Sequence, residues 1–190
     1  MSKSPAYSGW FGMCLVLAAL ITPGIAGGSR STVPGANGSS FQTSDPPINL
    51  ALDYSTYFGA EDIRGIAIDA DGNTYIAGAT ALPDLPTTAG ALQPKFSGQL
   101  DGFVAKLNAA GDKLIYSTYL SGSVTSTPFG PDKGHSVINA ISVAGDGSVY
   151  VTGATDESDF PTTAGAFQVS LKGTIDTFVA RLSPDGSRLI

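Results

Sequence analysis

The residues whose spacing could do chemistry are Asp69, Asp71 and Asn73, which place oxygen atoms at alternate positions of the stretch DADGN at residues 69–73. Calcium loops use this alternation of carboxylate and amide ligands. A related stretch at residues 144–148 reads AGDGS and lacks the first carboxylate, and neither stretch has an acidic residue at the distal position of a full calcium loop. An Asp-Gly hairpin turn explains both stretches. We therefore expect a turn, and we keep calcium as a candidate ligand while expecting no other metal or cofactor.

Two further groups of acidic residues could act in general acid–base catalysis. Glu61 and Asp62 form one, and Asp156, Glu157 and Asp159 form the other. Paired carboxylates of this kind cleave glycosidic bonds. Neither group recurs as a group elsewhere in the chain, and a solvated acidic loop accounts for each. We therefore predict no catalytic residues.

Nucleophilic catalysis has little support, because the only histidine, His135, lies among Gly and Pro residues. A serine nucleophile needs a base beside it and a third group that orients the base. We interpret His135 as a solvated loop residue. The net charge of −6 and the absence of a Lys/Arg cluster argue against nucleic-acid binding.

The elements that must position these residues occur twice. LPTTAGALQ at residues 85–93 returns 75 positions later as FPTTAGAFQ at residues 160–168. Charged residues make up only 14% of the chain, which holds 24 Gly and 12 Pro, a composition typical of short strands joined by tight turns. Alternating apolar residues predict antiparallel strands at residues 64–70, 74–79, 101–107 and 113–120, and again at 137–143, 149–154, 176–182 and from 188 onward. The fold class is therefore all-β, with four-stranded antiparallel units.

Three local features add to these units. Residues 53–59, DYSTYFG, predict one more strand ahead of the first unit. In the long loops 80–100 and 155–175, the threonines of the TTAGA motif could cap a short helical turn, with Leu92 or Phe167 as an apolar anchor. Asp101 and Asp176 each open a strand, and we expect them to accept hydrogen bonds from a neighbouring turn.

The N-terminal region reads as an export signal followed by a flexible leader. Residues 1–26 hold Lys3, an apolar run and a small-residue cleavage site, and the run is too short to span a bilayer, which takes about 20 residues. We expect no stable membrane span after cleavage, although an uncleaved anchor is the alternative. The only cysteine, Cys14, lies in this run, so the mature chain has no disulfide. Residues 27–52 form a Gly/Ser/Pro-rich leader, and residues 53–190 form the repeat region.

At the residue level the two copies resemble the bacterial SBBP-type β-propeller repeat. The resemblance rests on the YSTYF/YSTYL strands, the Asp-Gly turn before YIAG or YVTG, the PTTAGA loop and the DxFVAK/RL strand. It implies blades of a β-propeller, with blade one at about 60–120, blade two at about 134–190, and a polar loop insertion at 121–136. Propellers close with 4–8 blades. We therefore expect a fragment of a larger propeller, or copies that associate.

The resemblance implies an exported, secreted or cell-surface protein and brings no catalytic residues. We expect a non-enzymatic scaffold or binding module with a protein or carbohydrate ligand, and with further blades or self-association as its means of covering apolar faces. The alternative is part of a propeller enzyme, a polysaccharide hydrolase or lyase whose catalytic residues lie outside this chain.

Overall fold

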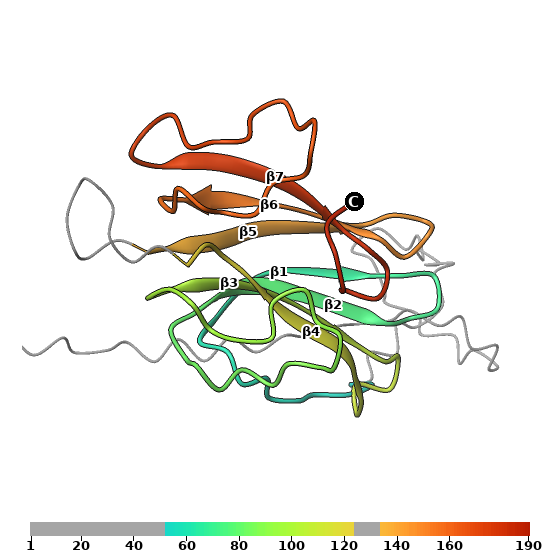
Figure 1. Cartoon of the computed structure of the whole chain (residues 1–190). Coiled ribbons are helices and arrows are strands. Elements are labelled where there is room, and N and C mark those ends of the chain that lie inside the picture. The colour runs from blue at the N-terminus through green and yellow to red at the C-terminus, as the bar shows by residue number, and fades with distance from the viewer. Residues whose placement is uncertain (1–51, 124–133) are drawn as a thin grey trace, which may run out of the picture. The chain divides into compact units, whose positions relative to one another are not determined.

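The computed structural model describes residues 52–123 and 134–190 (Figure 1). In these residues the chain forms seven antiparallel strands in two sheets and no helix, which confirms the all-β prediction. The proposed signal peptide 1–26, residues 27–51 of the leader and residues 124–133 of the insertion lie outside the described residues. All seven strands belong to one compact unit that holds residues 56–190. Within the described part of the chain, no helix is long and apolar enough to cross a membrane.

Sheet 1 has four strands in sequence order: β1 (Asp62–Ile68), β2 (Thr74–Thr80), β3 (Asp101–Leu107) and β4 (Leu114–Leu120). Each strand pairs with the next in antiparallel register. The first predicted unit is therefore confirmed as one four-stranded sheet.

Sheet 2 has three strands in the order β5 (Ser136–Val143), β6 (Val149–Thr155) and β7 (Asp176–Leu182). Where the sequence predicts the start of a fourth strand, Leu189 makes a single bridge to Leu182. Sheet 2 thus repeats β1–β3 of sheet 1 but has no described counterpart of β4.

The predicted Asp-Gly hairpins join β1 to β2 and β5 to β6. Gly72 and Gly147 occupy these turns with φ of 81° and 80°. Left-handed backbone at this position is accessible to glycine at little steric cost, which explains why these glycines occur in both copies.

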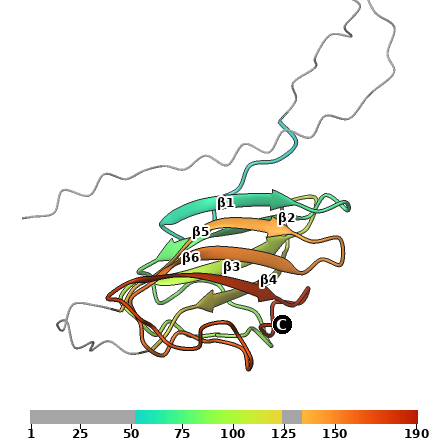
Figure 2. The ribbon, with the colours of Figure 1, turned by 90° about the horizontal axis from the view of Figure 1, so that it is seen from above.

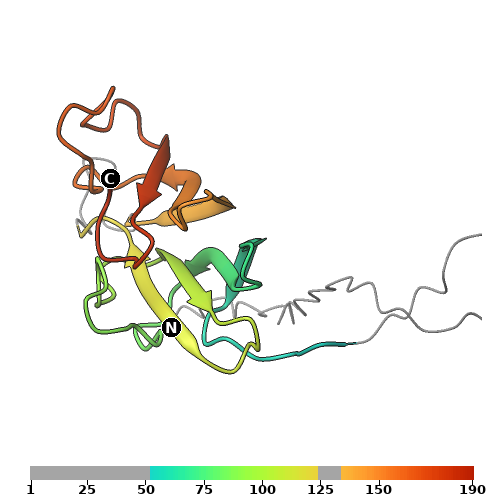
Figure 3. The same cartoon turned by 90° about the vertical axis from the view of Figure 1, so that its right-hand side faces the viewer.

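The sheets stand side by side and share one core (Figure 3). β5 lies along β1 and β2 and also contacts β3 (Figure 2). The shared core is built from one face of each sheet: Tyr75, Ala77, Val104, Tyr116 and Leu120 from sheet 1, with Ile138, Val149, Val151 and Leu182 from sheet 2. Glycines permit the close approach, because a Cβ at Gly65 would lie 2.9 Å from Ile141 and one at Gly102 would lie 3.1 Å from Ile138.

A second core covers the opposite face of sheet 1. It holds Ile76, Leu85, Phe103, Ala105 and Tyr119, packed against Phe58 and Phe96. The Phe58 and Phe103 rings stack at 5.8 Å, and the Phe96 and Tyr119 rings meet edge to face at 5.9 Å. Phe103 and Ala105 therefore face away from Val104, as the predicted alternation requires.

Three local predictions were wrong. Residues 53–59 form no strand, although Phe58 packs on sheet 1. The TTAGA motif makes a hydrogen-bonded turn, with the Ala91 N–H donating to the Thr88 carbonyl, but no helix. Leu92 is a partly buried anchor as expected, whereas its counterpart Phe167 is fully exposed.

Candidate functional site

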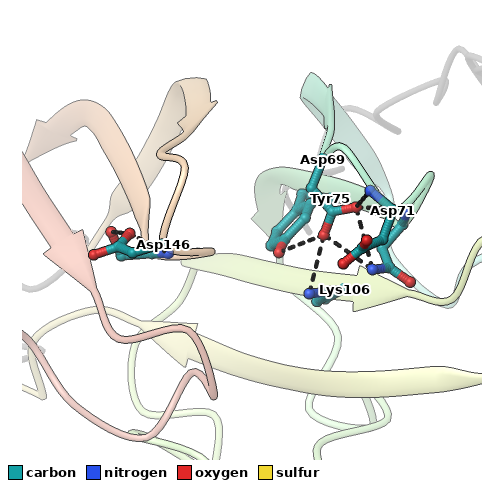
Figure 4. Close-up of polar contacts among 7 residues, drawn as sticks. Asp69, Asp71, Tyr75, Lys106 and Asp146 are labelled. Carbon is teal, nitrogen blue, oxygen red and sulfur yellow. Dashed lines mark hydrogen bonds and ion pairs between the residues drawn. The ribbon is translucent and has the colours of Figure 1, made fainter.

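The predicted calcium residues form a closed turn between β1 and β2 (Figure 4). Asp69 Oδ1 accepts hydrogen bonds from the backbone N–H groups of Asn73 at 2.9 Å and Asp71 at 3.1 Å. The Asn73 side-chain amide donates to Asp69 Oδ2 at 2.9 Å. These bonds let one carboxylate organise the whole hairpin turn.

Two residues from the strands complete the cluster around Asp69. The Lys106 ammonium lies 3.2 Å from Asp69 Oδ2, and the Tyr75 hydroxyl donates to the same oxygen at 3.1 Å. Lys106 also lies 4.7 Å from the centre of the Tyr75 ring. The Asp69 and Lys106 side chains are only 13% and 14% exposed.

The Asp69 carboxylate is therefore strongly stabilised in its charged form. Partial burial alone would raise its pKa, but hydrogen bonds from Asn73, Lys106 and Tyr75 outweigh burial and lower the pKa to about 2. A calcium ion here would have to compete with Lys106 for Asp69. No group of three His, Cys, Asp or Glu side chains in the described part of the chain is placed to hold a metal, and calcium binding by Asp69, Asp71 and Asn73 stays a prediction.

The second hairpin carries a more exposed version of the same cluster. Asp146 accepts hydrogen bonds from the Ser148 N–H and hydroxyl, and its Oδ2 lies 2.7 Å from Arg181. The hydrogen bonds from Ser148, with the Arg181 charge, lower the pKa of Asp146. Arg181 also lies 5.1 Å from the Tyr150 ring centre. Sequence reasoning missed the cation–aromatic part of both clusters, although its signal was present, because Tyr and a cation recur at matching positions of the two copies.

The acidic group at residues 156–159 lies at the crossover, which we define as the described residues 121–123 and 134–136, from the end of β4 to the first residue of β5. Glu157 is 1% exposed, and its Oε2 accepts hydrogen bonds from the Ser121 hydroxyl at 2.7 Å, the Gly122 N–H at 2.8 Å and the Ser136 hydroxyl at 2.5 Å. Glu157 Oε1 is buried without a hydrogen-bond partner. Burial raises the pKa of Glu157 despite the hydrogen bonds to Oε2.

The neighbouring acids hold the same crossover. Asp156 accepts a hydrogen bond from the His135 N–H at 2.9 Å, and its Oδ2 lies 3.3 Å from His135 Nδ1. Asp159 accepts hydrogen bonds from the N–H and hydroxyl of Ser123. The interpretation as a solvated acidic loop is therefore wrong for Asp156 and Glu157, and His135 is a partly buried partner of Asp156. Hydrogen bonds thus hold all three carboxylates to the crossover.

The remaining predicted acids have local partners. Asp101 accepts hydrogen bonds from the N–H groups of Ser97 and Gly98 at 2.7 and 2.9 Å, which confirms the expected turn. Asp176 accepts the equivalent hydrogen bonds from the N–H groups of Lys172 and Gly173, at 2.8 and 3.1 Å.

Glu61 and Asp62, the other predicted acid pair, also have separate partners. Glu61 Oε2 accepts a hydrogen bond from the Ala81 N–H at 2.9 Å, and Asp62 pairs with Arg64 at 2.7 Å. The two carboxylates are thus used in different local contacts, on exposed residues.

One candidate binding surface is a groove of about 830 Å³ beside β7, which we call the β7 groove. The loop after β6, β7 itself and the last two residues, Leu189 and Ile190, line it. Several apolar side chains of the groove are exposed to solvent: Phe167 is fully exposed, Val179 is 78% exposed, and Val169 and Ile175 are each 60% exposed. Apolar side chains gathered in this way are typical of interaction surfaces.

Comparison with protein-family models and with curated proteins finds no match to this chain.

Proposed function

We propose that this chain is an exported, non-enzymatic β-propeller repeat protein that acts as a surface scaffold or binding module. The observation that carries the proposal is the direction in which the two sheets pack. Sheet 1 contributes the face of Tyr75 and Val104 to the shared core, whereas sheet 2 contributes the opposite face, that of Val151 and Leu182.

Equivalent residues of the two sheets therefore have different environments. Tyr75 and Val104 are 0% exposed, but their counterparts Tyr150 and Val179 are 44% and 78% exposed. A two-fold arrangement would bury the same face of both sheets, whereas this head-to-tail arrangement leaves one complementary face open at each end. Repeated sheets that pack head to tail are the arrangement of blades in a propeller.

The other end of the stack shows the matching exposure. Ile66 and Ile68 of β1 are 43% and 41% exposed, whereas their counterparts Ile141 and Val143 on β5 pack against the shared core. A further sheet presenting a Tyr150-type face would cover Ile66 and Ile68. Further blades or other copies of the chain are thus the partners that these faces fit.

The polar residues favour a scaffold over the alternative of a polysaccharide-cleaving enzyme. Asp69 organises a turn, and Asp156, Glu157 and Asp159 hold the crossover. Each carboxylate is thus accounted for by packing and hydrogen bonding, and the exposed β7 groove offers apolar contacts suited to a protein or carbohydrate ligand.

Export and activity can be tested separately. A fusion of residues 1–52 to a phosphatase that is active only outside the cytoplasm should be active and should be cleaved near Ala26, as mapped by mass spectrometry. A phosphatase fusion lacking residues 1–26 is the control. Release of reducing or unsaturated sugar ends from a polysaccharide panel by the purified chain would overturn the non-enzymatic assignment, and an inactive full fusion would overturn export.

A further inference from the structure

We propose that residues 54–58 of one copy of the 190-residue chain add to sheet 2 of a second copy as its fourth strand, along the free edge of β7. The inference rests on the proposed scaffold role and deepens it, because it names a second copy as the partner and strand addition as the mode of contact. Strand addition supplies affinity through main-chain hydrogen bonds and specificity through alternate side chains.

The sequence of the donor segment matches β4, the strand of sheet 1 that has no counterpart among the described residues of sheet 2. Residues 54–58 read YSTYF, and β4 contains YSTYL at residues 116–120. In chain order, β4 leads into β5, the first strand of the next sheet, and residues 54–58 lead in the same way into β1. The donor segment therefore has both the sequence and the chain position of a β4 strand that belongs to a preceding sheet.

In sheet 1, β4 is bound on both sides. It pairs with β3, with Thr118 opposite Val104 and Tyr119 opposite Phe103. On the other side of β4, the Thr88 N–H donates to the Ser117 carbonyl at 3.2 Å, and the Gln93 N–H donates to the Thr118 hydroxyl at 2.9 Å. The fourth strand thus lies between β3 and the long loop.

Sheet 2 retains the same two binding elements. β7 repeats β3, and Thr163 and Gln168 stand in the second loop where Thr88 and Gln93 stand in the first. Of the described residues, only the last two meet the free edge of β7, through the Leu182–Leu189 bridge and the Ile190 N–H donating to the Arg181 carbonyl at 2.9 Å. A donor strand in the β4 register would start next to Ile190 and fill the β7 groove.

The middle of the donor segment is exposed, and its last residue is held on the far side of sheet 1 from β7. Tyr57 is 94% exposed, whereas its counterpart Tyr119 is 1% exposed. Phe58 is stacked on Phe103, in the core on the face of sheet 1 that lies away from sheet 2. A second copy can meet the segment there, and its Tyr150 face would then cover the exposed isoleucines of β1.

The register makes a sharp test. If residues 54–58 take the β4 position, Thr56 lies opposite Val179, as Thr118 lies opposite Val104 in sheet 1. Directly opposite residues in antiparallel strands are close enough to form a disulfide. Two differently tagged full-length chains, both carrying Cys14→Ser, would be mixed: one with Thr56→Cys and one with Val179→Cys. Thr177→Cys, two residues out of register, replaces Val179→Cys in the control mixture.

We expect a disulfide between the two tags that forms at least about tenfold faster with Val179→Cys than with Thr177→Cys, read on non-reducing gels and located by mass spectrometry. Equal rates in the two mixtures, or no crosslink, would overturn the proposal. In the unmodified chain, sedimentation equilibrium should show a concentration-dependent mass, with association weakened about tenfold by Thr56→Pro and unchanged by Leu52→Pro. A monomer at every concentration would overturn strand addition without touching export or the absence of enzymatic activity.

Discussion

Replacing the Asp69 carboxylate tests whether the first hairpin depends on its ion cluster. Asp69→Asn keeps the shape of the side chain and the acceptor for the turn, but it removes the charge that faces Lys106 and the acceptor oxygen shared with Tyr75. The matched control is Asp146→Asn in the second hairpin, where the pair with Arg181 is much more exposed, at 56% and 34%. Surface ion pairs contribute little to stability.

The magnitude follows from the pKa of Asp69. A drop from 3.8 to about 2 corresponds to about 2.4 kcal/mol in favour of the charged folded state. Partial solvent screening reduces this to about 1–2 kcal/mol, and the loss of a counter-ion for the largely buried Lys106 adds to the effect of the substitution. We expect Asp69→Asn to lower the free energy of unfolding by about 2 kcal/mol at pH 7, or roughly 5–10 °C in melting temperature, and Asp146→Asn to have a much smaller effect.

Urea unfolding followed by circular dichroism at several pH values provides the assay. Because the folded-state pKa of Asp69 is lowered, its contribution is fully present above about pH 4 and is lost as the pH falls through about 2. The difference between the native chain and Asp69→Asn should therefore be constant from pH 7 to about 5 and shrink below about pH 4. Equal losses for the Asp69 and Asp146 variants, or a difference that does not change with pH, would refute the reasoning.

Three further predictions concern the shared core and the crossover. Gly186→Ala should lower the free energy of unfolding by about 1–3 kcal/mol more than Gly165→Ala. Both glycines have positive φ, but only at Gly186 would an added Cβ lie 2.4 Å from the Tyr116 ring. Equal melting temperatures of the two variants would contradict this prediction. Tyr116→Phe should leave the free energy of unfolding unchanged or slightly higher, because the buried Tyr116 hydroxyl has no hydrogen-bond partner. Tyr119→Phe should lower the free energy of unfolding by about 1–3 kcal/mol, because the Tyr119 hydroxyl makes two hydrogen bonds to the backbone. A larger loss for Tyr116→Phe than for Tyr119→Phe in urea unfolding would refute this prediction. Glu157→Gln should raise the free energy of unfolding by about 1 kcal/mol at pH 7. The gain should fade as the pH drops, because the folded-state pKa of Glu157 is raised and its protonation therefore stabilises the native chain. A lower free energy of unfolding at pH 7 would show that the charge of Glu157 is needed.

Local chemistry in the sequence was enough to predict most of the strands. The Asp-Gly turns required glycine at positive φ, and the alternation in FVAKL placed Phe103 and Val104 on opposite faces, as the structure confirms. The acceptor role of Asp101 was equally local, because its partners lie within four residues.

Features that depend on distant residues could not be predicted in this way. The pairing of Lys106 with Asp69 joins a residue of β3 to one in the turn between β1 and β2, and the burial of Glu157 depends on serines far away in the sequence. The strand predicted at residues 53–59 illustrates the limit of propensity. Tyr, Thr and Phe favour a pleated surface, but a strand also needs a neighbouring edge, and in the described chain no edge pairs with this segment.

The crossover explains how a head-to-tail stack can have a defined register. Apolar packing between two sheets is not directional, so the shared core alone would tolerate sliding. Glu157 has an apolar counterpart, Leu82, in the first copy. One oxygen of Glu157, Oε2, accepts hydrogen bonds from Ser121 on one side of the crossover and from Ser136 on the other. A buried carboxylate with partners on both segments penalises every other alignment, because a shift would leave the charge without donors. We therefore expect Glu157 to lower stability at neutral pH and, in the same place, to fix how sheet 1 meets sheet 2.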